Sequence, residues 1–209
     1  MGQLSWIVVL PLLGFVLNGL LGNRFGARFV SAVGCGLPLL AFAVALKSFF
    51  DLGAPTSALV ETAYRWATIG DSTFDIAFYF DRLAAVMTLI VTGVGSLIHI
   101  YSIGYMKGDE SYGRYFAYLN LFLFFMLMLV LGRSLLVLFV GWEGVGLASY
   151  LLIGFWFDDP DKARAGTKAF ITNRVGDAGF LLGMFVLYQA FGTLDMDRIN
   201  AEFISGPTA

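Results

Sequence analysis

One carboxylate stands in the middle of a long apolar run. Glu143 lies nine residues after Ser134 in the segment 134–157, roughly 14 Å along a helix at 1.5 Å per residue. A hydrocarbon core is about 30 Å thick, so we expect Glu143 near its centre. A carboxylate there is costly unless it is paired, hydrated or protonated. Burial favours the neutral form and a nearby cation the charged form. Glu143 is therefore predicted to take up and release protons; a fixed ion pair joining two helices is the structural alternative.

A second pair of charges lies in the apolar segment 166–191. Arg174 and Asp177 are three residues apart and therefore share one helical face. They lie roughly 12 and 17 Å from Gly166 along the helix axis, at mid-depth. We expect them to pair with each other inside the bundle, which could be purely structural. In the functional interpretation they form a coupling pair, because moving Asp177 away from Arg174 would free a positive charge that favours the ionised form of Glu143.

Two further side chains are candidate relay groups. His99 lies deep in the segment 83–106, and an unperturbed pKa of about 6.5 suits proton relay; the alternative is a histidine that is simply hydrogen-bonded. Tyr150 is expected on the face of Glu143, where it could bond to a chain of water or merely pack. Gly144 and Ala148, four residues apart, form a small-residue face suited to close helix contact.

The chain lacks the residues for redox, zinc or nucleotide chemistry. It has one cysteine, Cys35, and one histidine, whereas an iron–sulfur cluster is held by about four thiolates and a structural zinc ion by about four ligands. Cys35 lies in an apolar run and is expected to be a small buried hydrophobe. The glycine runs at 93–96 and 144–147 lie inside apolar segments rather than between a strand and a helix, so they are not phosphate-binding loops. We expect no metal and no cofactor in this chain.

The composition requires a membrane. Of the 209 residues, 58% are hydrophobic and 13% are charged, and the mean hydropathy is +0.79, whereas a soluble domain carries about 25% charged residues. A net charge of −2 gives no basic surface for nucleic acid. A spanning helix needs about 20 mostly apolar residues. Six segments fit this requirement: 4–21, 29–50, 83–106, 115–132, 134–157 and 166–191. The predicted fold is thus an all-α polytopic membrane protein.

The basic residues of the connecting segments predict the orientation. Seven lie on the side of the odd-to-even connections: Arg24, Arg28, Lys107, Arg114, Lys162, Arg164 and Lys168. Five lie on the other side: Lys47, Arg65, Arg82, Arg133 and Arg198. Because basic residues favour the cytoplasmic side, both ends of the chain are expected on the outer face.

The only long connection precedes residue 83. Its alternating, aromatic-rich stretches flank the turn signal "GDS" at 70–72, a pattern that favours a β-hairpin at about 60–80. An irregular loop is the alternative. On the orientation above, this connection lies outside. The tail after Gly192 carries four charged residues and is expected at the surface.

Four stretches of sequence carry a resemblance to a known family. "GWEGVGLASYLLIGFW" at 141–156 and "KAFITNRVGDAGFLLG" at 168–183 resemble the largest antiporter-like subunit of respiratory complex I, called chain L in bacteria and subunit 5 in mitochondria. "GVGSLIHIYSIGYM" at 93–106 and "YFAYLNLFLF" at 115–124 also look like that subunit. The resemblance covers essentially the whole chain.

The resemblance implies a role in a proton-pumping NADH:quinone oxidoreductase of the bacterial inner membrane. The family glutamate of a proton channel maps onto Glu143, and the pair thought to couple neighbouring subunits maps onto Arg174 and Asp177. An exterior hairpin is also a family feature. The implied partners are other membrane-arm subunits, the lipid bilayer and protons, with no nucleic acid. FMN, iron–sulfur clusters and quinone would lie elsewhere in the complex.

The family chains are much longer, and the lysine partner of the glutamate lies on a later helix. We therefore expect this chain not to pump alone. Two rivals stay open. One is the large subunit of a multisubunit Na⁺/H⁺ antiporter, although "NRVGD" at 173–177 favours the complex I subunit. The other is a purely structural membrane scaffold.

Overall fold

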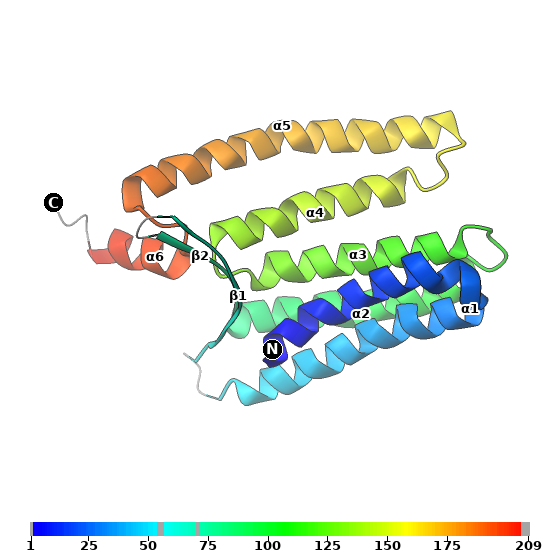
Figure 1. Ribbon diagram of the computed structural model, residues 1–209, viewed down its shortest axis with the longest axis horizontal. Coiled ribbons are helices and arrows are strands. Elements are labelled where there is room, and N and C mark those ends of the chain that lie inside the picture. The colour runs from blue at the N-terminus through cyan, green and yellow to red at the C-terminus, as the bar shows by residue number, and fades with distance from the viewer. Residues whose placement is uncertain (1, 54–56, 70–71, 206–209) are drawn as a thin grey trace.

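The computed structural model describes residues 2–53, 57–69 and 72–205. The chain is mostly helical, with one two-stranded sheet (Figure 1). In order, the elements are α1 (Gln3–Asp51), β1 (Leu59–Ile69), β2 (Ser72–Phe80), α2 (Arg82–Tyr105), α3 (Tyr112–Leu131), α4 (Leu135–Ile153), α5 (Pro160–Phe191) and α6 (Met196–Ser205). Within the described residues, five helices, α1 to α5, are long and apolar enough to cross a membrane.

Helix α1 reverses direction at a glycine. Gly26 has φ 78° and ψ 179°, a backbone conformation that glycine adopts without the steric cost of a side chain. The break divides α1 into a first arm, residues 3–25, and a second arm, residues 27–51, which runs back beside the first (Figure 1). Pro11 and Pro38 lie inside the two arms. A straight helix of 49 residues would be about 74 Å long, more than twice the thickness of a hydrocarbon core.

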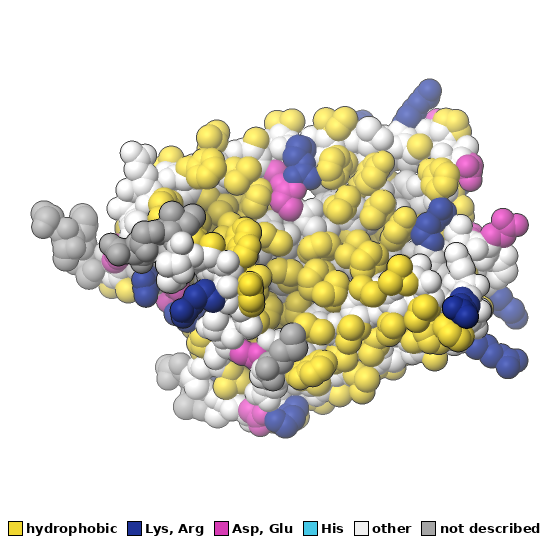
Figure 2. Space-filling model, viewed as in Figure 1, with side chains coloured by type: hydrophobic (Ala, Val, Ile, Leu, Met, Phe, Trp, Pro, Cys, Tyr) yellow, Lys and Arg dark blue, Asp and Glu magenta, His cyan; other side chains and the backbone are white. Residues whose placement is uncertain are grey.

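The helices form a layered bundle. Helix α3 contacts α1, α2 and α4, and α5 packs against α4, so α5 lies along one edge (Figure 1). Figure 2 shows apolar side chains over much of the visible lateral surface. Such a surface suits lipid or neighbouring helices rather than water. The main buried core lies near the sheet and includes Ile7, Phe80, Ala85, Leu127 and Leu131.

Local signals explain where several helices begin and end. Helix α5 begins at Pro160, earlier than the apolar run suggested, because the Asp159 side chain accepts from Asp161 N at 3.0 Å and proline is favoured in the first helical turn. Helix α4 ends before Gly154, and the Ser134 hydroxyl caps its start by accepting from Val137 N at 3.3 Å.

The sheet is an antiparallel hairpin between α1 and α2, with Val60 opposite Tyr79 and Thr68 opposite Thr73. Its expected turn at residues 70–71 lies outside the described residues. The turn between α3 and α4 is bonded to β2, because Arg133 N donates to Ala77 O at 3.0 Å, and to the α5–α6 loop, because Leu135 N donates to Leu194 O at 2.9 Å. The hairpin, the α3–α4 turn and the α5–α6 loop are therefore joined through backbone hydrogen bonds.

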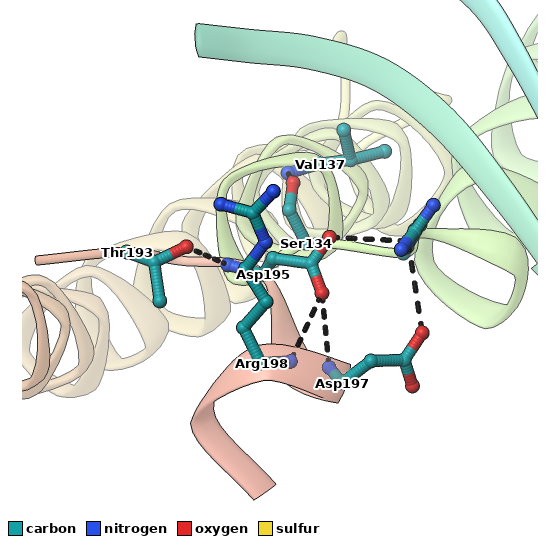
Figure 3. Close-up of polar contacts among 7 residues, drawn as sticks. Ser134, Val137, Thr193, Asp195, Asp197 and Arg198 are labelled. Atoms are coloured by element: carbon teal, nitrogen blue, oxygen red, sulfur yellow. Dashed lines mark hydrogen bonds and ion pairs between the residues drawn. The ribbon is translucent and has the colours of Figure 1, made fainter. Parts of the chain in front are cut away.

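Charged side chains reinforce that junction. Arg133 Nε lies 3.1 Å from one Asp195 oxygen and 3.6 Å from an Asp197 oxygen. The other Asp195 oxygen accepts from the backbone nitrogens of Asp197 and Arg198 at 3.0 and 3.3 Å, which caps α6 (Figure 3). Thr193 Oγ1 accepts from Asp195 N at 3.1 Å. The charged tail expected at the surface thus contains a short helix fixed to the α3–α4 turn.

A carboxylate of the hairpin holds the start of α1. Glu61 accepts from Gly2 N at 2.6 Å, Leu4 N at 2.8 Å and Ser5 N at 3.3 Å, and also from the Ser5 hydroxyl. The first backbone N–H groups of a helix have no partner within it, and Gly2 has no side chain to cap them. Glu61, 59 residues away from Gly2, supplies this cap and ties the hairpin to α1.

Replacing Glu61 by glutamine should loosen this contact. Glutamine places an NH₂ group among N–H donors and removes the negative charge. We expect a loss of about 1.5–3 kcal/mol in local stability, as for hydrogen bonds to charged groups, which corresponds to roughly 10–150-fold faster amide exchange at Leu4 and Ser5 because about 1.4 kcal/mol is a factor of ten. Hydrogen exchange of the full-length chain in lipid nanodiscs measures this. Asp75→Asn is the matched control, because Asp75 pairs at 3.6 Å with the exposed Arg65. Equal exchange in both variants would show that Glu61 does not hold the helix.

The same contact should weaken in acid. Burial alone would raise the pKa of Glu61, but the hydrogen bonds from Ser5, Gly2 and Leu4 together hold its pKa below the ordinary value. A carboxyl whose pKa is lowered on folding adds stability above its unfolded pKa, and that stability disappears as the pH falls through the folded pKa. We therefore expect exchange at Leu4 and Ser5 to accelerate below about pH 4.5 in the wild type, and to be insensitive to pH there in Glu61→Gln once intrinsic exchange is subtracted.

Candidate functional site

Helices α4 and α5 bring three charged side chains together. Arg174 on α5 forms an ion pair with Glu143 on α4, and its Nη1 atom lies 3.6 Å from Asp177 Oδ2 one turn further along α5. The expected Arg174–Asp177 pair is present, but Arg174 also contacts Glu143, so one cation is shared by two carboxylates. The Asp177 side chain is 8% exposed, Glu143 23% and Arg174 44%. Glu143, Arg174 and Asp177 together form the charged cluster.

Trp142 fixes one end of the charged cluster. Its Nε1 donates to Asp177 Oδ1 at 2.8 Å, and its ring stacks on Phe180 with the planes 1° apart. Sequence reasoning missed Trp142. A signal was present, because an indole N–H in an apolar helix must find an acceptor and an aspartate was expected at a similar depth on the next helix.

Aromatic rings lie beside the Arg174 end of the charged cluster. The guanidinium of Arg174 lies 4.6 Å from the centre of the Phe170 ring, an attractive cation–π distance. The Phe170 ring in turn lies 5.4 Å from that of Tyr150. Tyr150 thus lies at the edge of the charged cluster and reaches it through Phe170. Among the described residues its hydroxyl has no hydrogen-bond partner.

His99 lies in a different part of the bundle. It is buried on α2, where Nδ1 lies 2.7 Å from Gly95 O and the ring lies 6.3 Å from that of Phe116 on α3. The structure therefore brings Glu143, Arg174 and Asp177 together, leaves Tyr150 beside them, and holds His99 apart on α2. Cys35 is buried, as an apolar run suggests.

A groove opens beside the charged cluster. It has a volume of about 710 Å³ and lies between α3, α4 and α5. Its polar lining comes from Trp142, Ser149, Thr172, Asn173 and Asp177. Asp177 therefore lies at the wall of this groove, although its side chain is mostly buried. In the part of the chain that the structure describes, no group of three or more His, Cys, Asp or Glu side chains is gathered to hold a metal ion.

This arrangement allows a two-position exchange of charge. With Arg174 against Glu143, the ionised carboxylate is stabilised. With Arg174 drawn toward Asp177, Glu143 loses its cation in a low-dielectric setting, which favours its neutral, protonated form.

Close contact with α3 positions Glu143. Gly141 and Gly144, on either side of it, are buried. A side-chain carbon at Gly141 would meet Leu129 N at 2.5 Å and Leu129 Cα at 2.7 Å, and one at Gly144 would meet the Phe125 ring. The small-residue face of α4 therefore allows the backbones of α3 and α4 to approach closely.

Gly141→Ala should consequently destabilise the bundle. The obstacle is the α3 backbone, which cannot rotate away, so we expect a cost of about 1–3 kcal/mol from overpacking. Gly146→Ala is the matched control on the same helix, because nothing lies within 4 Å of its added carbon, and alanine favours a helix by up to about 1 kcal/mol over glycine. The melting temperature of the full-length chain in nanodiscs should fall for the first variant and hold or rise for the second. A fall of equal size in both would contradict the close-contact account.

Comparisons with known proteins match most of the chain to two family models. Residues 66–116 match "NADH-Ubiquinone oxidoreductase (complex I), chain 5 N-terminus". Residues 132–206 match "NADH:quinone oxidoreductase/Mrp antiporter, TM". The second match contains Glu143, Arg174 and Asp177.

Curated relatives match nearly the whole chain. NADH-quinone oxidoreductase subunit L of Mycobacterium tuberculosis is 45% identical over 94% of this chain and 32% of its own length. Subunit L of Escherichia coli K12 is 42% identical over 99% of this chain and 34% of its own length. NADH-ubiquinone oxidoreductase chain 5 of Allomyces macrogynus is 40% identical over 93% and 31%. The chain thus spans about a third of the length of these relatives.

Solved structures share the fold. A chain of the archaeal membrane-bound sulfane sulfur reductase, a respiratory membrane complex, superposes with a TM-score of 0.82 at 21% identity, covering 96% of this chain and 40% of that one. A chain of the Mrp complex from Dietzia sp. DQ12-45-1b gives 0.79 at 24% identity, covering 95% and 21%.

These matches and the apolar helices identify a multi-pass membrane protein. The chain belongs to the family of antiporter-like membrane subunits that includes subunit L of NADH-quinone oxidoreductase and chain 5 of NADH-ubiquinone oxidoreductase, and it corresponds to their N-terminal part.

Proposed function

We propose that this chain is the N-terminal part of a proton-translocating membrane-arm subunit of an NADH:quinone oxidoreductase, with Glu143 as the group that carries the proton. The observation that carries the proposal is the sharing of Arg174 between Glu143 and Asp177. A single cation between two carboxylates gives Glu143 two electrostatic states. The names of the relatives support the setting in which those states are used.

The proposal assigns the chemistry of electron transfer to other subunits. FMN, iron–sulfur clusters and quinone would bind elsewhere in the complex, and this chain would contribute proton conduction alone. Its partners would be neighbouring membrane-arm subunits and the lipid bilayer. A lysine on a later helix, as the family resemblance implies, would complete the proton path with Glu143. Tyr150 and His99 are secondary relay candidates.

The topology that we propose has six membrane crossings, because the two arms of α1 each cross once. The hairpin and α6 would then lie on the outer face of the bacterial inner membrane with both ends of the chain. The distribution of basic residues supports this orientation. The seven residues of the larger group lie in or near the α1 reversal and the α2–α3 and α4–α5 turns, and these turns are at the end of the bundle opposite the hairpin and α6 (Figure 1). Basic residues favour the cytoplasmic side.

The test begins with the native assembly that contains the full-length chain. It is purified, assayed for flavin, and reconstituted into proteoliposomes. We expect flavin to co-purify and NADH with a quinone to acidify the lumen without sodium. A second candidate function, the large subunit of a Na⁺/H⁺ antiporter, is favoured by the Mrp description of the match at 132–206. Sodium-driven proton flux in an assembly without flavin would overturn the first proposal and support the second.

A further inference from the structure

A second set of polar side chains is buried in the α1–α2–α3 bundle. Five of these side chains lie on α2 and are buried. They are spaced three or four residues apart and therefore share one face of the helix: Thr88, Thr92, Ser96, His99 and Ser102. They cover roughly 21 Å of helix at 1.5 Å per residue. Asn18 on the first arm of α1 and Asn120 on α3 are also buried, at 2% and 0% exposure. The charged cluster, by contrast, is built on α4 and α5.

Three of the four hydroxyl groups on this face donate to a backbone carbonyl one turn earlier, whereas Thr88 Oγ1 is buried and has no hydrogen-bond partner within the described residues. Thr92 Oγ1 donates to Thr88 O at 2.7 Å, Ser96 Oγ to Thr92 O at 2.7 Å, and Ser102 Oγ to Ile98 O at 2.8 Å. The lone pairs of these oxygens remain available to accept further hydrogen bonds. The face is therefore polar without being fully bonded.

His99 on this face and two asparagines beside it, Asn18 and Asn120, also hold polar atoms without partners. Within the described residues, both amide atoms of Asn18, Asn120 Oδ1 and His99 Nε2 are buried and have no hydrogen-bond partner. All three side chains lie near Phe116. The Phe116 ring is 6.3 Å from that of His99, its backbone oxygen accepts from Asn120 Nδ2, and a side-chain carbon at Gly34 would meet both Phe116 and Asn18. Buried polar groups nearly always find a partner in the protein or in ordered water, and in hydrocarbon the cost of leaving one unpaired is high.

The orientation of Asn120 is determined by its neighbours. Its Nδ2 donates to Phe116 O at 2.9 Å and to Gly34 O at 3.3 Å, so its oxygen must face the other way. Oδ1 points toward Gly14 on the first arm of α1, where an added side-chain carbon would collide with it. The amide cannot be flipped without placing an oxygen against two carbonyl groups. Asn120 Oδ1 therefore needs a donor from outside its own helix.

The protonation of the His99 ring follows from the same reasoning. Gly95 O can only accept, so Nδ1 carries the hydrogen in the contact at 2.7 Å. Nε2 is then a bare acceptor in the neutral ring and a donor in the cation. A water molecule can donate to Nε2 of the neutral ring and can accept from Nε2 of the cationic ring, whereas a protein group that only donates or only accepts can bond to one of these two forms.

We propose that ordered water occupies the interior of the α1–α2–α3 bundle, bound by the Asn18 amide, Asn120 Oδ1 and His99 Nε2. A bound water typically makes about three hydrogen bonds to otherwise unsatisfied groups, and this cluster supplies both donors and acceptors. The water gives His99 Nε2 a partner with which to exchange a proton, at a place separate from Glu143.

A density map at water-resolving resolution tests the proposal directly. The sample is the full-length chain in its native assembly, in lipid nanodiscs. We expect ordered density at about 2.7–3.2 Å from Asn120 Oδ1, from the Asn18 amide and from His99 Nε2. A dry interior in which Asn18 Nδ2 donates directly to Asn120 Oδ1, and His99 Nε2 meets only apolar atoms, would overturn the proposal.

A variant gives a second test, because the melting temperature is expected to change in opposite directions with and without bound water. Asn18→Leu keeps a similar volume and removes the amide. If Asn18 binds water, the water loses a partner and the melting temperature of the assembly falls. If the Asn18 amide is buried with neither a protein partner nor bound water, its removal leaves the melting temperature unchanged or raises it. That result would contradict the proposal. Asn23→Leu, at an exposed position on the same arm, is the control and should melt like the wild type.

Discussion

Replacing Glu143 by glutamine is expected to slow proton transfer through this subunit by about 100-fold or more, because a positioned acid–base group contributes roughly 10²–10⁴-fold to a step in which it carries the proton. Glutamine keeps the size of the side chain and an oxygen that Arg174 can approach, so the helices should stay together. What is lost is the capacity to bind and release a proton. Arg174 keeps its second partner, Asp177.

The measurement is the initial rate of lumen acidification in proteoliposomes that hold the full-length chain in its assembly, driven by NADH and a quinone. Glu110→Gln is the matched control, since Glu110 is exposed in the turn between α2 and α3 and the same chemical change there should leave the flux intact. Wild-type flux in Glu143→Gln would contradict the proposed carrier and favour a structural scaffold.

Asp177→Asn is expected to hold Glu143 in its ionised form. Asparagine keeps an oxygen for the Trp142 N–H, which now donates at 2.8 Å, but it no longer competes for Arg174. Two opposite charges at about 4 Å attract by about 4 kcal/mol at an effective dielectric constant of 20, so releasing Arg174 to Glu143 should lower the protonated fraction of Glu143 by about tenfold or more. Proton flux should fall because the carboxylate is rarely reloaded.

The comparison has two parts. The infrared C=O band of protonated Glu143, identified by its loss in Glu143→Gln, should be weaker in Asp177→Asn than in the wild type at the same pH. Trp142→Phe removes the N–H that donates to Asp177 and keeps an aromatic ring beside Phe180; because the charge of Asp177 stays, the change should be smaller than in Asp177→Asn. Asp158→Asn, in the exposed α4–α5 turn, serves as the control. Identical titrations of Glu143 in the wild type and in Asp177→Asn would remove the coupling role of the pair.

Periodicity and composition predicted the helical, apolar character of the chain because these depend on local sequence. The charges that stand out in apolar runs, Glu143, Arg174 and Asp177, were recognisable for the same reason. Asp159 and Pro160 also carried a local signal for the start of α5. What these patterns could not predict is how Arg174 divides between its neighbours, because that depends on the packing of α4 against α5.

Contacts between distant parts of the chain were also beyond the sequence patterns. Glu61 caps the start of α1 from 59 residues away, and Arg133 joins α6 to the α3–α4 turn. Each contact requires the hairpin and the helix ends to be placed first. The unpartnered amide of Asn18 belongs to the same class, because its burial results from the reversal of α1 at Gly26.

The central claim is that a carboxyl group halfway across the membrane changes its protonation during each cycle. Time-resolved infrared difference spectroscopy of the working assembly tests it most directly, with the Glu143→Gln variant used to assign the band. The account predicts a carboxyl C=O band that appears and disappears in step with turnover and is absent from the variant. A Glu143 that keeps one protonation state through every stage of turnover would contradict it.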